Sequence, residues 1–330
     1  MAVAAFISPG KDIATAVARV QHAERLGYEA VFSTQVGGRD ALMTLAAYAA
    51  GTETIKLATG VLPAFPRHPV SLGIEAATLD EITGGRLILG IGPSHQITME
   101  TWYGIEMRKP LKRIQEYVTI LRSIFTTNGV SFEGEFYKTQ FAFLAYAARS
   151  DLPIYISALA PGMLRFCGEA CDGDILWGCL PTYIRETVTP TIHGAATSAG
   201  RDPSAVTIVA AVPTALTSNR EAAFQAFRKD FFVYMTLPFY RRAIAGAGYE
   251  GELKAFDDAG STGDFAGQLA AISDRMLEEF GAVGDERQIA DKYSEYREAG
   301  VTLPAAGLFN AGDGFAGVEE TLEAVARVAG

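Results

Sequence analysis

The segment from residue 57 to residue 96 constrains the fold of this chain more than any other part of the sequence. Two apolar runs of strand length, residues 55–60 and 87–92, flank a helix that Pro69 opens and that ends near residue 82. Two strands joined by a helix form a right-handed βαβ unit with parallel strands. Both strands end in glycine and polar residues, at the edge where parallel α/β folds bind ligands. The segment therefore predicts a parallel sheet with a site at one edge.

The alternation of strands and helices continues along almost the whole chain. Apolar runs predict strands at residues 3–7, 30–33, 55–60, 87–92, 153–158, 174–177, 206–215 and 303–308. Helical periodicity and end signals predict helices at residues 12–26, 40–50, 69–82, 110–126, 163–170, 182–198 and 286–299. Eight strands alternating with helices predict an α/β fold of the (β/α)8 TIM-barrel type. The alternative is a doubly wound open sheet, but no G-x-G-x-x-G turn follows the first strand.

Two segments fall outside this alternation. Residues 131–138 have a period of two, which predicts a short hairpin before the fifth strand. Residues 220–284 are too long for one crossover helix and rich in aromatic residues, so we expect a helical insertion between strands seven and eight that partly covers the barrel mouth. Its aromatic residues fit either a large apolar pocket or a helix packed on the barrel. Because no Gly/Ser/Pro-rich linker is present, residues 1–330 are expected to form a single domain.

The charge of the chain limits its partners. With a formal net charge of −10, the chain lacks the basic face that nucleic acids or anionic membranes would need, so we expect neither partner and instead a small-molecule substrate. No apolar run approaches the roughly 18–20 residues of a membrane helix, and the N-terminus lacks a signal-peptide pattern. These features predict a cytoplasmic protein.

Metal and redox sites receive little support from the sequence. The cysteines Cys167, Cys171 and Cys179 fit small buried residues better than a metal cluster, because no histidine follows them at ligand spacing. The triplet at residues 172–174, Asp-Gly-Asp, lacks the further acidic ligands of a calcium loop and is interpreted as turn chemistry. The four histidines are not spaced as a metal set. No metal site is expected.

Candidate site residues follow strands three, four and five. Gly60 permits close approach of the backbone to a flat ligand, although a β-bulge alone would also explain a glycine there. Arg67 could contact an anion, whereas His68 is interpreted as a helix cap. His95 titrates near neutral pH on a strand-end loop, which makes it a candidate acid or base. Small residues at 157–162 precede a helix whose free N–H groups would suit a phosphate.

The two regions RHPVSLGIEAATLDEITGGRLILGIGPSHQ and ALAPGMLRFCGEACDGDILWG resemble the signature regions of the luciferase-like monooxygenase superfamily. The segment GIGPSHQ followed by WYGIEMRKPLKRIQEYVTIL is similar to the branch that depends on the deazaflavin coenzyme F420, which includes methylenetetrahydromethanopterin reductases. The resemblance implies a bacterial-luciferase-like barrel that binds a flavin or deazaflavin at its C-terminal mouth. It also implies a non-prolyl cis peptide between Gly60 and Val61 behind the ring. The other implied cofactor-binding residues are Pro63, Pro93, Ser94, Thr98, Ala158, Leu159, Pro161 and Gly162.

The sequence departs from this branch at two places. His95 stands where the branch's sugar-phosphate dehydrogenases carry a Glu proton acceptor, and Thr34-Gln35 stand where they carry an Asp-His pair. Losing that histidine removes a general acid or base, which disfavours sugar-phosphate oxidation. His95 is therefore the predicted catalytic residue, either in a proton role or as a hydrogen-bonding partner of the ring.

The resemblance leads to one expected function and two alternatives. We expect a coenzyme F420-dependent oxidoreductase that transfers a hydride to or from a small organic substrate, with C=C or C=N reduction favoured. The first alternative is an FMN-dependent two-component monooxygenase, which would take reduced flavin from a partner reductase. The second is a non-catalytic flavin-binding protein on the same barrel. Family members commonly form dimers, so a homodimer is expected.

Overall fold

The computed structural model describes residues 2–329 and contains a closed parallel β-barrel. β1 pairs with both β2 and β12, with Ala4 opposite Ala30 on one side and opposite Ala305 on the other, and these pairings close the ring. The barrel strands are β1 (Ala4–Phe6), β2 (Ala30–Ser33), β3 (Lys56–Thr59), β5 (Leu87–Gly92), β8 (Ile154–Ile156), β9 (Gly173–Leu176), β10 (Thr207–Leu216) and β12 (Leu303–Leu308). The predicted TIM barrel is confirmed, and the open sheet is wrong.

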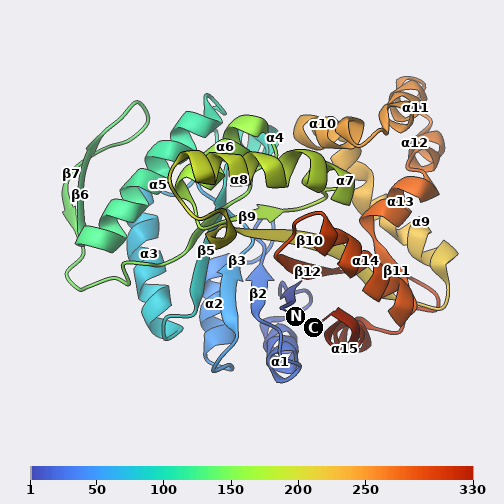
Figure 1. Cartoon of the computed structure of the whole chain (residues 1–330), viewed down its shortest axis with the longest axis horizontal. Coiled ribbons are helices and arrows are strands. Elements are labelled where there is room, and N and C mark those ends of the chain that lie inside the picture. Colours follow the sequence, from blue (N-terminus) through green and yellow to red (C-terminus); the bar gives the residue numbers. More distant parts are fainter. Residues whose placement is uncertain (1, 330) are drawn as a thin grey trace.

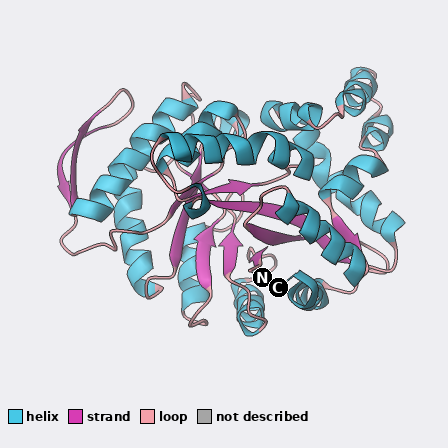
Figure 2. Ribbon diagram, in the orientation of Figure 1, coloured by secondary structure: helices cyan, strands magenta, loops and turns pink. Residues whose placement is uncertain are grey.

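Helices surround the strands, as Figure 2 shows with helices in cyan and strands in magenta. The helices that pack around the barrel are α1 (Ile13–Arg25), α2 (Ala41–Ala49), α3 (Pro69–Ile82), α5 (Pro110–Thr127), α6 (Pro161–Ala170), α8 (Thr189–Ser198), α14 (Glu286–Glu298) and α15 (Val318–Ala329). Side chains at the helix starts explain several of these boundaries. Asp12, Asp40 and Asp285 each accept a hydrogen bond from a backbone N–H of the first helical turn.

The interior of the barrel is filled by side chains that alternate along the strands. Ala4 and Ala30 point inward at the amino-terminal side, Phe6 and Phe32 follow two residues later on their strands, and Ala58 of β3 is in register with Phe32. The two phenylalanine rings stack with their centroids 5.2 Å apart. These two rings form an aromatic floor at this side of the barrel mouth, beside the smaller Ala58 and Gly307 that are in register with them.

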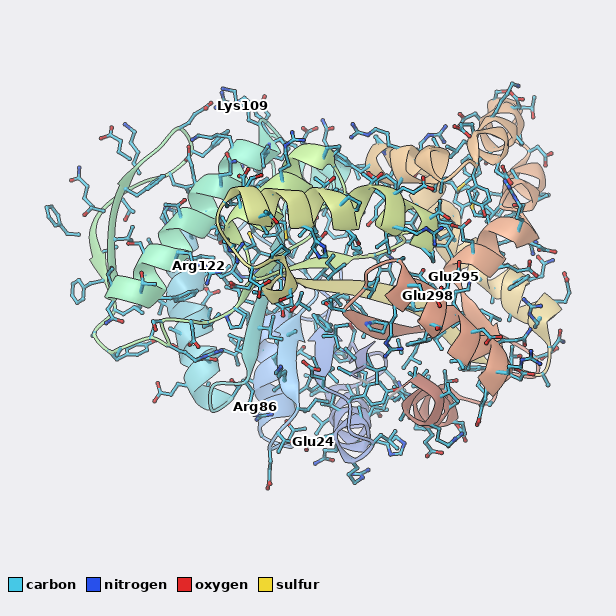
Figure 3. All side chains as sticks on the ribbon, in the orientation of Figure 1. Glu24, Arg86, Lys109, Arg122, Glu295 and Glu298 are labelled. Carbon is cyan, nitrogen blue, oxygen red and sulfur yellow. The ribbon has the colours of Figure 1, made fainter. Side chains whose placement is uncertain are left out.

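Salt bridges and hydrogen bonds join the loops at the opposite, amino-terminal edge of the barrel. The Glu24 carboxylate accepts hydrogen bonds from the backbone N–H groups of residues 53–55, and these bonds lower its pKa to about 2 against the opposing effect of burial. The Arg86 guanidinium donates to the carbonyls of Thr52, Ile55 and Thr83. Figure 3 labels Glu24 and Arg86 at the lower edge of the molecule. These hydrogen bonds hold the starts of the strands in place at this edge, and the candidate site lies at the opposite, carboxyl edge.

The structure differs from the sequence-based elements in a few places. A helix that the sequence did not predict, α4 (Gln96–Trp102), follows the loop after β5. The predicted helix at 182–198 is divided into α7 (Pro181–Tyr183), a π-helix (Ile184–Val188) and α8. Helix α6 begins at Pro161 rather than at residue 163. The first N–H groups of a helix have no hydrogen-bond partner within the helix. Proline has no N–H, so beginning α6 at Pro161 loses no hydrogen bond.

The hairpin and the insertion lie at opposite ends of the molecule in Figure 1. The predicted hairpin is confirmed with longer strands, β6 (Gly129–Glu133) and β7 (Lys138–Phe143). The insertion is helical as predicted, with α9 (Arg220–Phe231), a 3-10 helix (Phe232–Thr236), α10 (Pro238–Gly246), α11 (Glu250–Ser261), α12 (Phe265–Ala271) and α13 (Asp274–Phe280). It ends in β11 (Ala282–Gly284), a short strand on β10 that the sequence did not predict. A separate cluster of buried apolar residues lies under these helices.

Candidate active site

A β-bulge interrupts the pairing of strands at the end of β3. Ala58 pairs with Ile88 of β5, and Leu62 of the two-residue strand β4 (Leu62–Pro63) then pairs with Ile91. The β3 side advances by four residues while β5 advances by three, so one residue is extra on the β3 side. The peptide bond between Gly60 and Val61 lies in this bulge and is cis, as the resemblance implied.

Two glycines at the bulge lie where a side chain would not fit. A Cβ on Gly60 would lie 2.8 Å from both Phe6 Cε1 and Phe32 Cβ, and a Cβ on Gly92 would lie 2.3 Å from Ser157 Oγ. Val61, which is partly exposed, packs against the interior cluster of the barrel. The glycines therefore let the bulge and the end of β5 approach the aromatic floor, and the β-bulge that would by itself explain Gly60 is present. The close approach to a flat ligand stays a prediction.

The residues after β5 form a turn that leads into α4. Ser94 has a positive φ of 65°, and His95 is the N-cap of α4 without a side-chain cap bond. Burial lowers the pKa of the His95 imidazole, so the ring stays neutral at lower pH than a free histidine. Its centroid lies 6.1 Å from that of Tyr240, which α10 of the insertion contributes. Pro93 and Ser94 are partly exposed beside it, whereas Thr98 is buried in α4.

Three hydroxyl groups at the strand ends were not among the predicted cofactor contacts. Ser8 and Thr34 continue the inward alternation of Phe6 and Phe32, and their hydroxyl oxygens are 2.9 Å apart. Ser157 stands two residues after the inward-facing Tyr155 and lies against Gly92. The signal that could have identified them is the period of two, extended past the last apolar residue of each strand. Gln35 instead accepts a hydrogen bond from the backbone of Ala41 and orients the start of α2.

Aromatic side chains from the insertion reach the mouth of the barrel. Trp177, directly after β9, packs on both the interior cluster and the cluster under the insertion, and its ring meets Phe6 edge-on at 5.3 Å. Tyr240 lies against Gly178, whose Cβ would be 3.2 Å from the ring, and against Tyr234 at 4.8 Å. Tyr240, from α10 of the insertion, thus lies beside His95, in accord with the prediction that the insertion partly covers the mouth.

The segment after β8 is held by a buried acid. Asp174, in β9, accepts a hydrogen bond of 2.8 Å from the backbone N–H of Ala158, and its other carboxylate oxygen has no hydrogen-bond partner among residues 2–329. Burial raises the pKa of this carboxyl well above its usual value. Asp174 occupies a fully buried position of β9, as the predicted strand at residues 174–177 has it, and the interpretation of residues 172–174 as a turn is wrong for this residue.

Helix α6 offers an uncapped N-terminus at the next residues. Its N-cap residue is Ala160, which has no side chain that could accept from the first turn, and Pro161 and Gly162 form that turn. Gly162 lies against Leu111 of α5. Pro161 has no N–H and the Met163 N–H donates to the Ala160 carbonyl at 2.9 Å, so the first turn leaves the Gly162 N–H. That donor and the positive end of the helix dipole favour a phosphate at this place. Leu159, partly exposed, anchors the segment through its carbonyl, which accepts from the Tyr183 hydroxyl at 2.9 Å.

Other candidates from the sequence have structural roles. Arg67 pairs with Asp40 and with Glu75, and His68 caps α3 by accepting from the backbone of Val70 at 3.2 Å, as interpreted. The cysteines Cys167, Cys171 and Cys179 are free and buried, as interpreted. Within residues 2–329, no group of His, Cys, Asp and Glu side chains is arranged to hold a metal ion. No described helix has both the length and the apolar character to cross a membrane.

One surface depression lies away from these residues. It has a volume of about 460 Å³ between α10 and α11, and its lining includes Arg241 and Leu253 but no predicted site residue. Arg241 is paired with Asp257 at 2.6 Å, and the Arg242 guanidinium lies over the Phe239 ring at 4.7 Å from its centroid.

The residues at the mouth fit a flat ring that carries a phosphate-bearing tail. The partly exposed Val61 and Trp177 offer apolar surface over the aromatic floor, and the hydroxyls of Ser8 and Ser157 lie at its edge. The uncapped start of α6 supplies the Gly162 N–H and the positive end of its dipole for a phosphate. Both a deazaflavin and FMN have this general form, so the donor set fits either group.

Known proteins resemble this chain over most of its length. A family model described as luciferase-like monooxygenase matches residues 1–303. A 5,10-methylenetetrahydromethanopterin reductase from Archaeoglobus fulgidus is 30% identical over 293 residues, which cover 87% of this chain and 87% of the relative. A putative coenzyme F420-dependent oxidoreductase from Mycobacterium tuberculosis is 26% identical over 309 residues, 86% of this chain and 88% of that protein. The solved coenzyme F420-dependent tetrahydromethanopterin reductase from Methanopyrus kandleri superposes with a TM-score of 0.84 at 24% identity, covering 99% of this chain and 98% of that one.

Proposed function

We propose, from the premise that this chain belongs to the luciferase-like monooxygenase family, that it is a coenzyme F420-dependent oxidoreductase. Its substrate would be a small organic molecule, and reduction of a C=N or C=C bond is the favoured reaction. The observation that carries the proposal is the bulge of Gly60 and Val61 beside the Pro93–His95 turn, above an aromatic floor. The reductase and oxidoreductase relatives, which match this chain over most of its length, support the same chemistry.

The bound deazaflavin would supply the two-electron hydride chemistry, and the chain would supply orientation and electrostatics. Val61 would support one face of the ring, and Pro93, Ser94 and Thr98 would line its side. Ala158, Leu159, Pro161 and Gly162 would hold the tail, because they lead into the uncapped helix start. Pro63 pairs with Gly92 and fixes the exit of the bulge. Trp177, which follows β9, and Tyr240 of the insertion would exclude water.

Binding of the cofactor provides the first test. We expect the purified protein, titrated with F420 and with FMN in parallel, to bind F420 at least about tenfold more tightly, a difference of about 1.4 kcal/mol. Binding would be followed by the change in cofactor fluorescence. Binding of FMN alone would contradict the proposal and support the two-component monooxygenase, which would then show oxygen consumption with reduced FMN.

The predicted homodimer and the predicted reductase partner stay predictions.

His95 is the residue for which we expect a direct effect on turnover. Reduction of a C=N or C=C bond adds a hydride and a proton, so a protonated His95 would donate that proton, whereas the neutral imidazole that burial favours would hydrogen-bond to the substrate. A positioned acid or base contributes about 100-fold or more to a rate. In His95→Ala we expect the turnover of reduced F420 to fall by about 100-fold. Turnover would be measured with the most active acceptor from a panel of imines and activated alkenes. The dissociation constant for F420 should stay within a few-fold of the wild type. Unchanged turnover would remove His95 from the catalytic residues.

A further inference from the structure

The bulge leaves part of β5 without a backbone partner on β3. Ala58 pairs with Ile88 and Leu62 pairs with Ile91, so Leu89 and Gly90 lie between two paired positions. The backbone N–H and C=O of Gly90 both find one partner, the side-chain hydroxyl of Thr59. Thr59 Oγ1 accepts from Gly90 N at 2.8 Å and donates to Gly90 O at 2.7 Å. A single hydroxyl therefore replaces the missing backbone partner.

The same residue is fixed from several sides. Thr59 is fully buried. Its carbonyl oxygen lies 2.0 Å from where a Cβ on Gly90 would be, so the two backbones touch at this point. On the other side, Gly60 N donates to Ser33 O of β2 at 2.8 Å. The first residues of the bulge are thus held to β2 through Gly60 and to β5 through the Thr59 hydroxyl.

We propose that Thr59 is a positioning residue, whose hydroxyl sets the position of the Gly60–Val61 backbone relative to the end of β5. The inference rests on the proposed function, because the position of Gly60 and Val61 affects activity only if the cofactor ring packs against them. Thr59 itself would not touch the cofactor. It acts through the backbone of the two residues that follow it. A residue with a purely structural role would affect unfolding but would leave cofactor affinity unchanged in the folded protein.

The test compares Thr59→Val with Thr59→Ser. Val keeps the shape of the side chain but removes the hydroxyl, which leaves two buried backbone groups of Gly90 unpaired, whereas Ser keeps the hydroxyl. We expect Thr59→Val to weaken F420 binding by about tenfold or more, equivalent to about 1.4 kcal/mol, and Thr59→Ser to stay within about threefold of the wild type. Thr59→Ala replaces Thr59→Val if the latter does not fold. Alanine leaves room for a water molecule beside the Gly90 backbone groups, so the affinity of Thr59→Ala for F420 should fall between those of Thr59→Ser and Thr59→Val.

Tyr28→Phe is the matched control. The Tyr28 hydroxyl donates to the buried carbonyl of Leu322 at 2.8 Å, and Tyr28 lies before β2 at the other edge of the barrel. Its loss should lower the melting temperature, as Thr59→Val does, without changing the affinity for F420. Equal loss of affinity in both variants, or wild-type affinity in folded Thr59→Val, would overturn the inference.

Amide hydrogen exchange separates this inference from the proposed function. In the protein without cofactor, Thr59→Val should speed exchange in a peptide covering residues 57–64, whereas Thr59→Ser should not. If the wild type binds neither F420 nor FMN, the proposed function fails, and the exchange result still decides whether Thr59 holds the bulge. Unchanged exchange in Thr59→Val would overturn the inference even where binding is intact.

Discussion

Gly90→Ala should lower the free energy of unfolding by about 3 kcal/mol, at the upper end of the usual cost of overpacking. The added Cβ would lie 2.0 Å from the carbonyl oxygen of Thr59 and 2.6 Å from Ile175 Cδ1. The first of these neighbours is backbone, held by the bonds of the bulge on both sides, so it cannot move away as a flexible side chain could. Urea unfolding would measure the loss, and F420 titration should show weaker binding because the bulge is displaced.

Gly194→Ala is the matched control for this substitution. Gly194 lies inside α8, is exposed, and has no heavy atom within 4 Å of the position of an added Cβ. Alanine at such a position should stabilise the protein by about 0.5–1 kcal/mol, because it reduces the conformational freedom of the unfolded chain. Wild-type stability in Gly90→Ala would show that β3 and β5 are not in the close contact described.

Asp174→Asn should stabilise the protein at neutral pH, by about 1–3 kcal/mol, because it replaces an acid whose pKa burial raises with an amide that cannot ionise. Asn keeps an oxygen that can accept from the N–H of Ala158 and cannot ionise. The folded-state pKa of Asp174 is raised well above 3.8, the value of the unfolded chain. The contribution of Asp174 to stability is therefore fully present below that unfolded value and is lost as the pH rises toward the folded pKa.

The pH dependence distinguishes this effect from a simple change in packing. From about pH 4 to about pH 8, the wild type should lose stability relative to Asp174→Asn, and the gap should widen as the pH rises. Urea unfolding at several pH values measures the gap. Asp291→Asn is the control, because Asp291 is exposed and should change neither the stability nor its slope. A gap that is constant with pH would show that Asp174 does not hold a proton in the folded state.

Local sequence patterns were sufficient for most of the barrel. The strand at residues 87–92 was predicted with the bounds of β5, because an unbroken apolar run bounded by glycines fits a strand buried on both faces. The division of residues 181–198 into three helical pieces was missed, because periodicity does not distinguish a π-helical turn from an α-helical one. Asp174 was interpreted as part of a turn, since Asp-Gly-Asp is typical of turns and its burial depends on neighbouring strands.

The candidate site likewise combines features that the local sequence shows with contacts between residues far apart in the chain. The sequence marked Gly60, Gly92 and His95, and the resemblance supplied the cis bond, because these features belong to single strand ends. The pairing of Thr59 with Gly90 joins residues that are 31 positions apart. The meeting of His95 with Tyr240 joins the barrel to its insertion.

By itself the sequence determined the alternation of strands and helices, the barrel that follows from it, and the strand ends at which a ligand would bind. These depend on hydrophobic periodicity and turn chemistry, which act over a few residues. Only the tertiary structure decided which hydroxyls, carboxylates and rings meet at the mouth, and that Asp174 is buried with one oxygen unpaired. Such contacts depend on the register of the bulge and on the closure of the ring, and no local pattern encodes the distance between two strands.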